Sequence, residues 1–280
     1  GIVIGDTVSL KRAGDVIPQV INYIPNLRPK NYKKISFPIY CPSCNSLLKR
    51  EKNEAIIRCI NATECSEQIK GQLIHFVSRN AFNIEGLGEK QIIELFDRNI
   101  IKGPEDIFLI NQDMEKEIKE KILGLSGWGA LSLSNLIKSI NNAKNQPIEK
   151  IIYSLGIRHV GQGTAKLISK NYKSSDDLIN KIKNLEINIK KEEFIEELRS
   201  VNGIGDKAIF ALVSYFLINK TQFFNLIGFL NISTPVSVKN NMHYLYGKRL
   251  VFSGTFEHLS RTEIKNKAEI VGALISSQVS

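Results

Sequence analysis

The chain has 280 residues, 42% of them hydrophobic, which is too long for one small core and fits two to four compact units. It contains no run of eighteen apolar residues, so we expect no membrane-spanning helix. The formal charge of +10 favours an anionic partner, but lysine, isoleucine and asparagine are abundant throughout, so charge alone decides little.

Residues 1–37 have the pattern of strands and turns. Thr7–Lys11 alternates with period two, as a half-buried strand does, and a Gly-Asp turn at 14–15 precedes a second extended run. The chain begins without Met in a strand-like run, ends after another one at Ser280, and shows no signal peptide. We therefore expect it to be a piece of a longer protein.

Residues 38–70 contain every cysteine of the chain, spaced C-x2-C-x14-C-x5-C: Cys41, Cys44, Cys59 and Cys65. Two close pairs on turns can place four thiolates around Zn²⁺ at about 2.3 Å each, and such a site is structural because no coordination position stays open. The alternatives are two disulfides, free core thiols, or an iron–sulfur cluster, whose common spacings do not match. We expect His75 to be an ordinary, partly buried histidine.

Residues 71–230 change to a helical spacing of apolar residues. Four Gly-x-Gly turns lie in this range, each ahead of a helix-like segment: Gly86-Leu87-Gly88, Gly127-Trp128-Gly129, Gly161-Gln162-Gly163 and Gly203-Ile204-Gly205. Aligned by these glycines, the turns are 41, 34 and 42 residues apart. This repetition predicts a stacked array of similar helical units.

The turns are suited to binding phosphate. Glycines let the backbone turn tightly and approach a partner, and the following helix presents free N–H groups at a positive dipole end, without reading bases. Lys90 and Lys207 stand two residues past the second glycine of the first and fourth turns, and Lys166 stands one position later in the third. The second turn has Leu131 there, so we expect it to be structural. The alternative is that each turn only joins two helices, which is the commoner role of an isolated copy.

Residues 231–246 lack periodicity and contain Pro235, which predicts a linker. Residues 247–280 predict a strand at 249–253, a turn, a helix at 261–271 and a strand at 273–277.

In this order, the segments resemble the C-terminal part of bacterial NAD-dependent DNA ligase, and the resemblance covers essentially the whole chain. The segments that carry it are Ile4–Val8, Arg12–Pro18, Phe37–Cys44, Leu73–Arg79, Ile84–Lys90, Leu155–Gly161 and Gly247–Thr255. The resemblance implies a multidomain α+β chain. Its expected parts are the C-terminal part of an OB β-barrel (1–37), a small four-cysteine zinc finger (38–70), an all-α helix-hairpin-helix array with four motifs (71–230), the linker (231–246), and the N-terminal part of an α/β BRCT domain (247–280).

The resemblance also implies a function. Enzymes of this family seal 5′-phosphate/3′-hydroxyl nicks in duplex DNA in replication and repair, through enzyme–AMP and DNA–adenylate intermediates, with NAD⁺ and Mg²⁺. Their nucleophilic lysine lies in a K-x-D-G motif, which this chain lacks, so we expect no catalytic residue and no NAD⁺-binding residue here. We expect structural Zn²⁺ in this chain, and NAD⁺ and Mg²⁺ sites mostly outside it. The expected DNA-binding residues are Arg12, Gly86, Gly88, Lys90, Arg158, Gly161, Gly163, Lys166, Gly203, Gly205 and Lys207.

The expected partner is nicked double-stranded DNA of any sequence, bound by a monomer at the nucleoid in the bacterial cytoplasm, with no membrane involved. Two other classes stay open. One is a non-enzymatic DNA- or junction-binding module with helix-hairpin-helix repeats, and the other is a base-excision glycosylase. A glycosylase should carry a catalytic carboxylate soon after a hairpin, but Asp206 is better explained as a first-turn acid that favours the helix dipole. The combined motifs favour the ligase.

Overall fold

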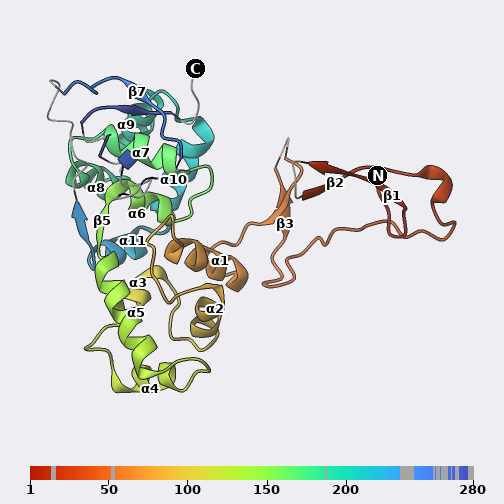
Figure 1. The fold of residues 1–280 in the computed structure, drawn as a ribbon, viewed down its shortest axis with the longest axis horizontal. Helices are drawn as coiled ribbons and strands as arrows, with labels where there is room; N and C mark the ends of the chain where they lie inside the picture. The colour runs from red at the N-terminus through yellow and green to blue at the C-terminus, as the bar shows by residue number, and fades with distance from the viewer. Residues whose placement is uncertain are drawn as a thin grey trace. The chain divides into compact units, whose positions relative to one another are not determined.

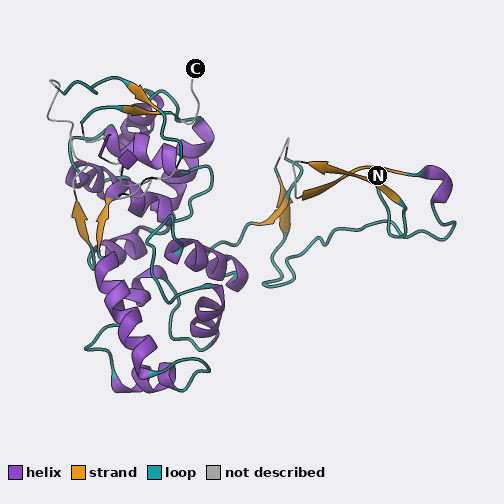
Figure 2. Cartoon of the chain, in the orientation of Figure 1, coloured by secondary structure: helices purple, strands orange, loops and turns teal. Residues whose placement is uncertain are grey.

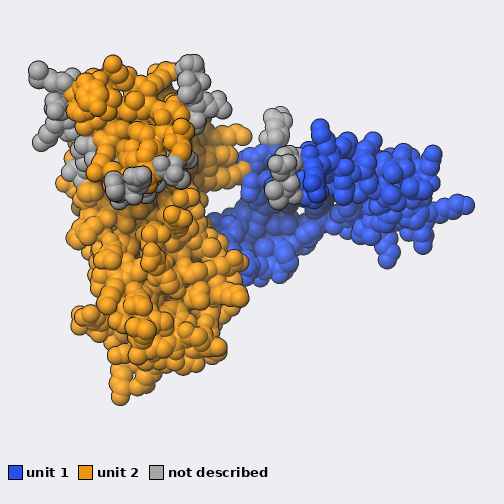
Figure 3. All heavy atoms as spheres, in the orientation of Figure 1, with its two compact units in different colours: residues 1–69 blue, residues 70–280 orange. Residues whose placement is uncertain are grey.

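The computed structural model describes residues 1–13, 17–51, 54–186, 188–233, 243–254, 256, 259, 264–265, 267–268 and 271–276. The chain divides into two compact units, residues 1–69 and 70–280 (Figure 3). The boundary falls within helix α1 (Ser66–Val77). Among the described residues, no helix has the length and apolar character needed to cross a membrane.

The first unit consists of two antiparallel hairpins (Figure 2). Strands β1 (Val8–Ala13) and β2 (Ile17–Tyr23) pair with a bulge between Ser9 and Leu10, and β3 (Leu48–Arg50) pairs with β4 (Ile57–Cys59). The two strands predicted within residues 1–37 are therefore present. The described residues form a two-stranded ribbon there, not a closed barrel, so the OB-fold stays a prediction. The predicted turn at 14–15 lies outside the described residues.

The second unit is mostly helical (Figure 1). After α1 its helices are α2 (Glu89–Asp97), α3 (Pro104–Leu109), α4 (Lys116–Leu123), α5 (Ala130–Ala143), α6 (Ile148–Ser154), α7 (Gln162–Lys170), α8 (Ser175–Lys183), α9 (Asn188–Arg199), α10 (Asp206–Ile218) and α11 (Lys220–Ile227).

The four turns share one backbone geometry, and it corrects our alignment of the third turn. In the first, second and fourth turns the first glycine has positive φ, and the second is an extended N-cap of the next helix. In the third turn the residue with positive φ is His159, at 66°, and the N-cap of α7 is Gly161. Gly163 is therefore the second residue of the helix. The third turn is His159-Val160-Gly161, two residues earlier than the glycine pattern indicated.

The hydrogen bonds confirm the corrected alignment. In each turn, the amide of the residue between the positive-φ position and the N-cap donates to the carbonyl three residues earlier. These bonds run from Leu87 to Ile84, Trp128 to Leu125, Val160 to Ile157 and Ile204 to Val201. Each N-cap carbonyl accepts from the residue four positions later: Ile92, Leu133, Ala165 and Ile209. These four donor residues are all buried, so every hairpin attaches to the core at the same position.

The corrected alignment also reveals a duplication within the helical unit. The first and third turns are 73 residues apart (86 to 159), and the second and fourth are 76 apart (127 to 203). Helices α1–α5 and α6–α10 are thus two five-helix modules, each with two turns separated by three helices. The middle helices of these two sets, α3 and α8, begin alike, because Asp106 accepts from the Lys102 amide at 2.7 Å and Asp177 accepts from the Lys173 amide at 3.4 Å.

The core of the second unit is built on aromatic side chains. Phe76 and Phe82 stack with ring centres 4.2 Å apart, and Phe108 meets both of them edge-on. Phe229, after α11, stacks on Phe108 at 6.2 Å, which packs the end of the helical region against the first module.

Two short parallel strand pairs complete the described structure. Strand β5 (Asn145–Pro147) pairs with β6 (Asn231–Ser233), so the region expected to be all helical contains a strand, and the first three residues of the expected linker form another. Residues 234–242 lie outside the described residues. Strands β7 (Arg249–Leu250) and β8 (Leu274–Ile275) fall within the two strands expected for 247–280. Most of the expected helix at 261–271 is not described, and the BRCT assignment stays a prediction.

Replacing His159 with glycine should stabilise the helical unit. An L-residue in the left-handed region costs roughly 1–2 kcal/mol, whereas glycine enters it freely. Part of that gain is lost to the greater freedom of glycine in the unfolded chain. We expect His159→Gly to raise the free energy of unfolding by about 1 kcal/mol in urea titrations. His159→Ala is the matched control and should give no gain. An equal gain in both variants would mean that the side chain, not the backbone, is responsible.

Candidate metal centre and nucleic-acid interface

The four cysteines form one sulfur cluster. Their Sγ atoms all lie within 4.8 Å of one another, with Cys41 and Cys65 3.9 Å apart and Cys44 and Cys59 3.5 Å apart. A regular tetrahedron with 2.3 Å zinc–sulfur bonds has sulfurs about 3.8 Å apart, whereas a disulfide requires about 2.05 Å. The four thiols are free, and their arrangement fits a structural Zn²⁺ ion rather than two disulfides.

Three local structures bring the sulfurs together. Cys41 and Cys44 lie on a tight knuckle, in which the Asn45 amide donates to the Cys41 carbonyl at 2.9 Å. Cys59 is the last residue of β4, and its carbonyl accepts from the Gln68 side chain at 2.8 Å. Cys65 directly precedes α1, and its carbonyl accepts from the Ile69 amide. A knuckle, a hairpin end and a helix start thus converge on one point.

One of the four cysteines, Cys44, ionises more readily than an ordinary thiol. The Ser46 hydroxyl lies 3.3 Å from Cys44 Sγ, and hydrogen bonds from the side chain and the backbone amide of Ser46 lower the pKa of Cys44 to about 6, while burial and the neighbouring sulfurs raise the pKa of Cys59 to about 11. Since metals bind thiolates, the Cys44 thiol is prepared for coordination near neutral pH.

The starts of the four hairpin helices are open to solvent. At each one the N-cap glycine and the next two residues are exposed or half-buried, and these triplets are Gly88–Lys90, Gly129–Leu131, Gly161–Gly163 and Gly205–Lys207. The N-cap φ angles lie between −131° and −83°, and none of the four has a side-chain cap on the helix amides. Each start therefore presents helix N–H groups to the outside.

One turn differs from the other three. The Gly129 amide donates to the Ser132 hydroxyl at 2.8 Å, so this N-cap amide is already satisfied within the chain. Among the described residues, the amides of Gly88, Gly161 and Gly205 have no acceptor. Leu131, at the position that holds a lysine in the first and fourth turns, is 76% exposed. Three turns can thus accept an anion, while the second is closed by its own serine.

The predicted cations take different positions relative to these turns. Lys90 and Lys207 are exposed second residues of α2 and α10, as expected. Lys166 is the fifth residue of α7 and half-buried, so it does not occupy the equivalent place. Arg158 is half-buried beside His159. Arg12 is exposed on β1 in the other unit.

Two histidines have simple structural roles. The expectation for His75 is confirmed, because its ring lies 2.9 Å from the Tyr153 carbonyl and packs edge-on against the Tyr153 ring at 4.8 Å. His159 holds the left-handed position of the third turn, and its side chain is exposed. The hydrogen bond from the Gly129 amide to Ser132 was not predicted from the sequence, in which its only signal is a serine three residues after Gly129.

Family comparisons place both features in known groups. Residues 40–66 match the NAD-dependent DNA ligase C4 zinc finger domain, and residues 150–223 match the helix-hairpin-helix motif. The first match contains all four cysteines, and the second contains the third and fourth turns.

Longer similarities extend along the whole chain. Proteins described as DNA ligase from Rickettsia prowazekii (strain Madrid E), Nitrobacter winogradskyi and Bacillus cereus (strain G9842) are 37%, 38% and 37% identical over 279, 283 and 285 residues. Each alignment covers 99% of this chain. The predicted resemblance to the C-terminal part of NAD-dependent DNA ligase is confirmed. The chain spans about 40% of the length of these relatives.

Metal analysis should find one Zn²⁺ per chain. Cys59→Ser should release the metal and loosen the β3–β4 hairpin, because the segment has little core of its own. Plasma mass spectrometry of the purified chain and amide exchange across residues 40–66 measure these two effects. Ser43→Ala changes a non-ligand residue of the same knuckle and should keep the metal. Finding iron, or no zinc with the hairpin intact, would contradict the assignment.

Proposed function

We propose that this chain is the DNA-clamping portion of an NAD-dependent DNA ligase that seals nicks in duplex DNA. The observation that carries the proposal is the set of three open helix starts whose N-cap amides have no acceptor among the described residues. Backbone amides at a helix N-terminus bind phosphate oxygens without regard to base sequence. A nick can occur at any sequence, so a sequence-independent grip fits this role.

The chain's own residues would position DNA and carry out no chemical step. Gly88, Gly161 and Gly205 would donate backbone hydrogen bonds to phosphates, and Lys90 and Lys207 would add direct charge contacts. Gly163 and Lys166 lie within α7, so they would not supply the N-cap contact of the third turn. The bound zinc would hold the knuckle, hairpin and helix start of residues 41–65 in one arrangement.

The remaining chemistry would belong to parts of the longer protein. The family's lysine nucleophile lies in a K-x-D-G motif, and this sequence has none. NAD⁺ and Mg²⁺ would therefore bind mostly outside residues 1–280. Catalysis of phosphoryl transfer depends largely on positioning and charge neutralisation, so a clamp that fixes the duplex contributes to the rate.

Adding a methyl group at the N-cap glycine of an open helix start should weaken DNA binding without disturbing the fold. Gly205 is extended, and a Cβ built on it meets no atom within 4 Å, so alanine fits the folded chain. Bound phosphate would occupy that open space. We expect Gly205→Ala to raise the Kd for a nicked duplex about tenfold, equivalent to ~1.4 kcal/mol. Fluorescence anisotropy at fixed salt measures it.

Gly129→Ala is the matched control for this variant. Its Cβ also meets open space, but its amide is already bonded to Ser132, so DNA affinity should not change. Gly86 and Gly203 are poor test positions, because their φ values of 93° and 97° would strain any substituted side chain. Equal weakening by Gly205→Ala and Gly129→Ala would reject the division of roles among the turns.

The salt dependence of DNA affinity should show whether the lysines at the helix starts contact phosphates. Each phosphate neutralised contributes about −0.9 to the slope of log affinity against log salt concentration. We expect Lys207→Ala to reduce the magnitude of this slope by about 0.9, equally for nicked duplexes of several sequences. A slope that does not change, or an effect confined to one sequence, would contradict phosphate binding at this turn.

The chain alone should not react with NAD⁺. Because the nucleophile lies outside it, intact-mass spectrometry after incubation with NAD⁺ and Mg²⁺ should show no AMP adduct, and a nicked duplex should remain unsealed. The full-length protein is the positive control. An adenylylated lysine within residues 1–280 would overturn this division of labour.

A further inference from the structure

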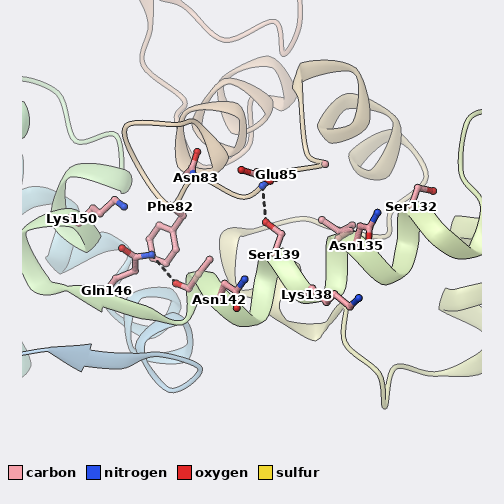
Figure 4. Close-up of a pocket in the computed structure, with 13 residues that line it drawn as sticks. Phe82, Asn83, Glu85, Ser132, Asn135, Lys138, Ser139, Asn142, Gln146 and Lys150 are labelled. Carbon is pink, nitrogen blue, oxygen red and sulfur yellow. Dashed lines mark hydrogen bonds between the residues drawn. The ribbon is translucent and has the colours of Figure 1, made fainter. Parts of the chain in front are cut away.

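A polar groove of about 700 Å³ lies within the second unit, beside the first turn (Figure 4). One wall is the loop Phe82–Gly86 and the other is helix α5, with Lys150 of α6 at one end. Its lining residues are Phe82, Asn83, Glu85, Gly86, Ser132, Asn135, Leu136, Lys138, Ser139, Asn142, Ala143, Gln146 and Lys150.

The α5 wall is a row of hydroxyl and amide side chains. Its polar members recur at helical spacing, so they share one face of the helix: Ser132, Asn135, Ser139 and Asn142. Ser139 accepts from the Glu85 amide at 2.7 Å, which holds the loop against the helix. The side chains of Asn135 and Asn142 make no hydrogen bond to any residue that the structure describes. They can therefore both donate to and accept from a ligand.

Lys150 gives this groove a partly desolvated positive charge. It is half-buried, and burial lowers the pKa of its amine. Within the described ranges it has no acidic partner, and its amine points toward Phe82 across the end of the groove (Figure 4). The charged groups lining the groove are Lys138 and Lys150 against Glu85. A half-buried ammonium without a counterion is unfavourable, and a bound anion would relieve that cost.

We infer that this groove holds one phosphodiester of a DNA strand together with its adjoining deoxyribose. Lys150 would contact the phosphate, and Asn135 and Asn142 would bond to sugar and phosphate oxygens. The inference rests on the proposed function, since it adds a DNA contact that none of the helix starts provides. None of these proposed contacts is to a base edge, so binding in the groove would not depend on base sequence.

The position and lining favour a strand of DNA over a free nucleotide. Gly86 lines the groove and lies two residues before Gly88, so a strand held at the first turn continues directly into the groove. The one aromatic residue that lines the groove, Phe82, is only 1% exposed, so it offers no open face on which a nucleotide base could stack. The amides and hydroxyls of α5 instead match the oxygen-rich sugar–phosphate backbone.

Lysine acylation with detection by mass spectrometry tests the inference on the unmodified chain. A nicked duplex should reduce the labelling of Lys150 severalfold, whereas AMP at the same phosphate concentration should leave it unchanged. Lys183, a lysine at the end of α8 outside the groove, is the internal control and should not be protected. Protection of Lys150 by AMP but not by duplex would overturn the inference in favour of a nucleotide site.

Binding by variants gives an independent measurement. Lys150→Gln should reduce the magnitude of the salt slope by about 0.9, as expected for one lost phosphate contact. Lys150→Arg should restore most of it, and Lys183→Gln should leave it unchanged. Thermal melts confirm that each variant is folded.

The outcomes separate this inference from the proposed function. If the unmodified chain fails to bind duplex, the proposed function fails as well. If it binds and Gly205→Ala weakens binding, while Lys150 is neither protected nor needed for the salt slope, the groove alone is rejected.

Discussion

The helical unit depends on one backbone constraint, which is a residue in the left-handed region placed two positions before an extended glycine. The first residue reverses the chain, and the second begins a helix without capping it. Serine or aspartate at the N-cap would satisfy the first amides from within the chain, whereas glycine costs only a few tenths of a kcal/mol by comparison. The small loss in helix stability leaves N–H groups available to a ligand. The second turn illustrates the alternative, because Ser132 returns to the Gly129 amide and closes the site.

Sequence predictions succeeded where the deciding feature is local. The cysteine site follows from spacing alone, because a knuckle and a later pair are local features that must converge if a metal is to bind. Three of the four turns were correctly aligned, because their left-handed residue is a glycine. The third was misplaced because histidine occupies that position and Gly163 happens to complete a second Gly-x-Gly pattern. A better signal was present in the apolar positions, since Ile157 precedes His159 by two residues, as Ile84 precedes Gly86. Aligning on buried positions would have been more reliable, because the core constrains them more strictly than a turn constrains glycine.

Other features could not be read from local pattern. Strands β5 and β6 are three residues each and pair across 86 positions, from Asn145 to Asn231. Three residues are too few to establish a period of two, and the segment around β6 has the composition of a linker. The groove beside α5 depends on tertiary packing, because Glu85 in the loop Phe82–Gly86 meets Ser139 of α5, a residue 54 positions later in the chain. Helical periodicity shows only that α5 has a polar face, not what lies opposite it.

The duplication gives the proposed clamp its physical logic. Each five-helix module carries one helix start with a lysine at the second position, at Lys90 and at Lys207, and one without. The half-buried His75–Tyr153 pair joins α1 to α6, and the stacking of Phe229 on Phe108 packs the segment after α11 against the first module. The spacing between the two lysine-bearing starts is therefore set by side-chain packing rather than by a linker. Weak phosphate contacts add most effectively when their spacing is fixed before binding, because the ligand then does not have to order the protein. A pair of rigid modules can thus grip a regular duplex through its backbone, and none of these contacts requires a particular base.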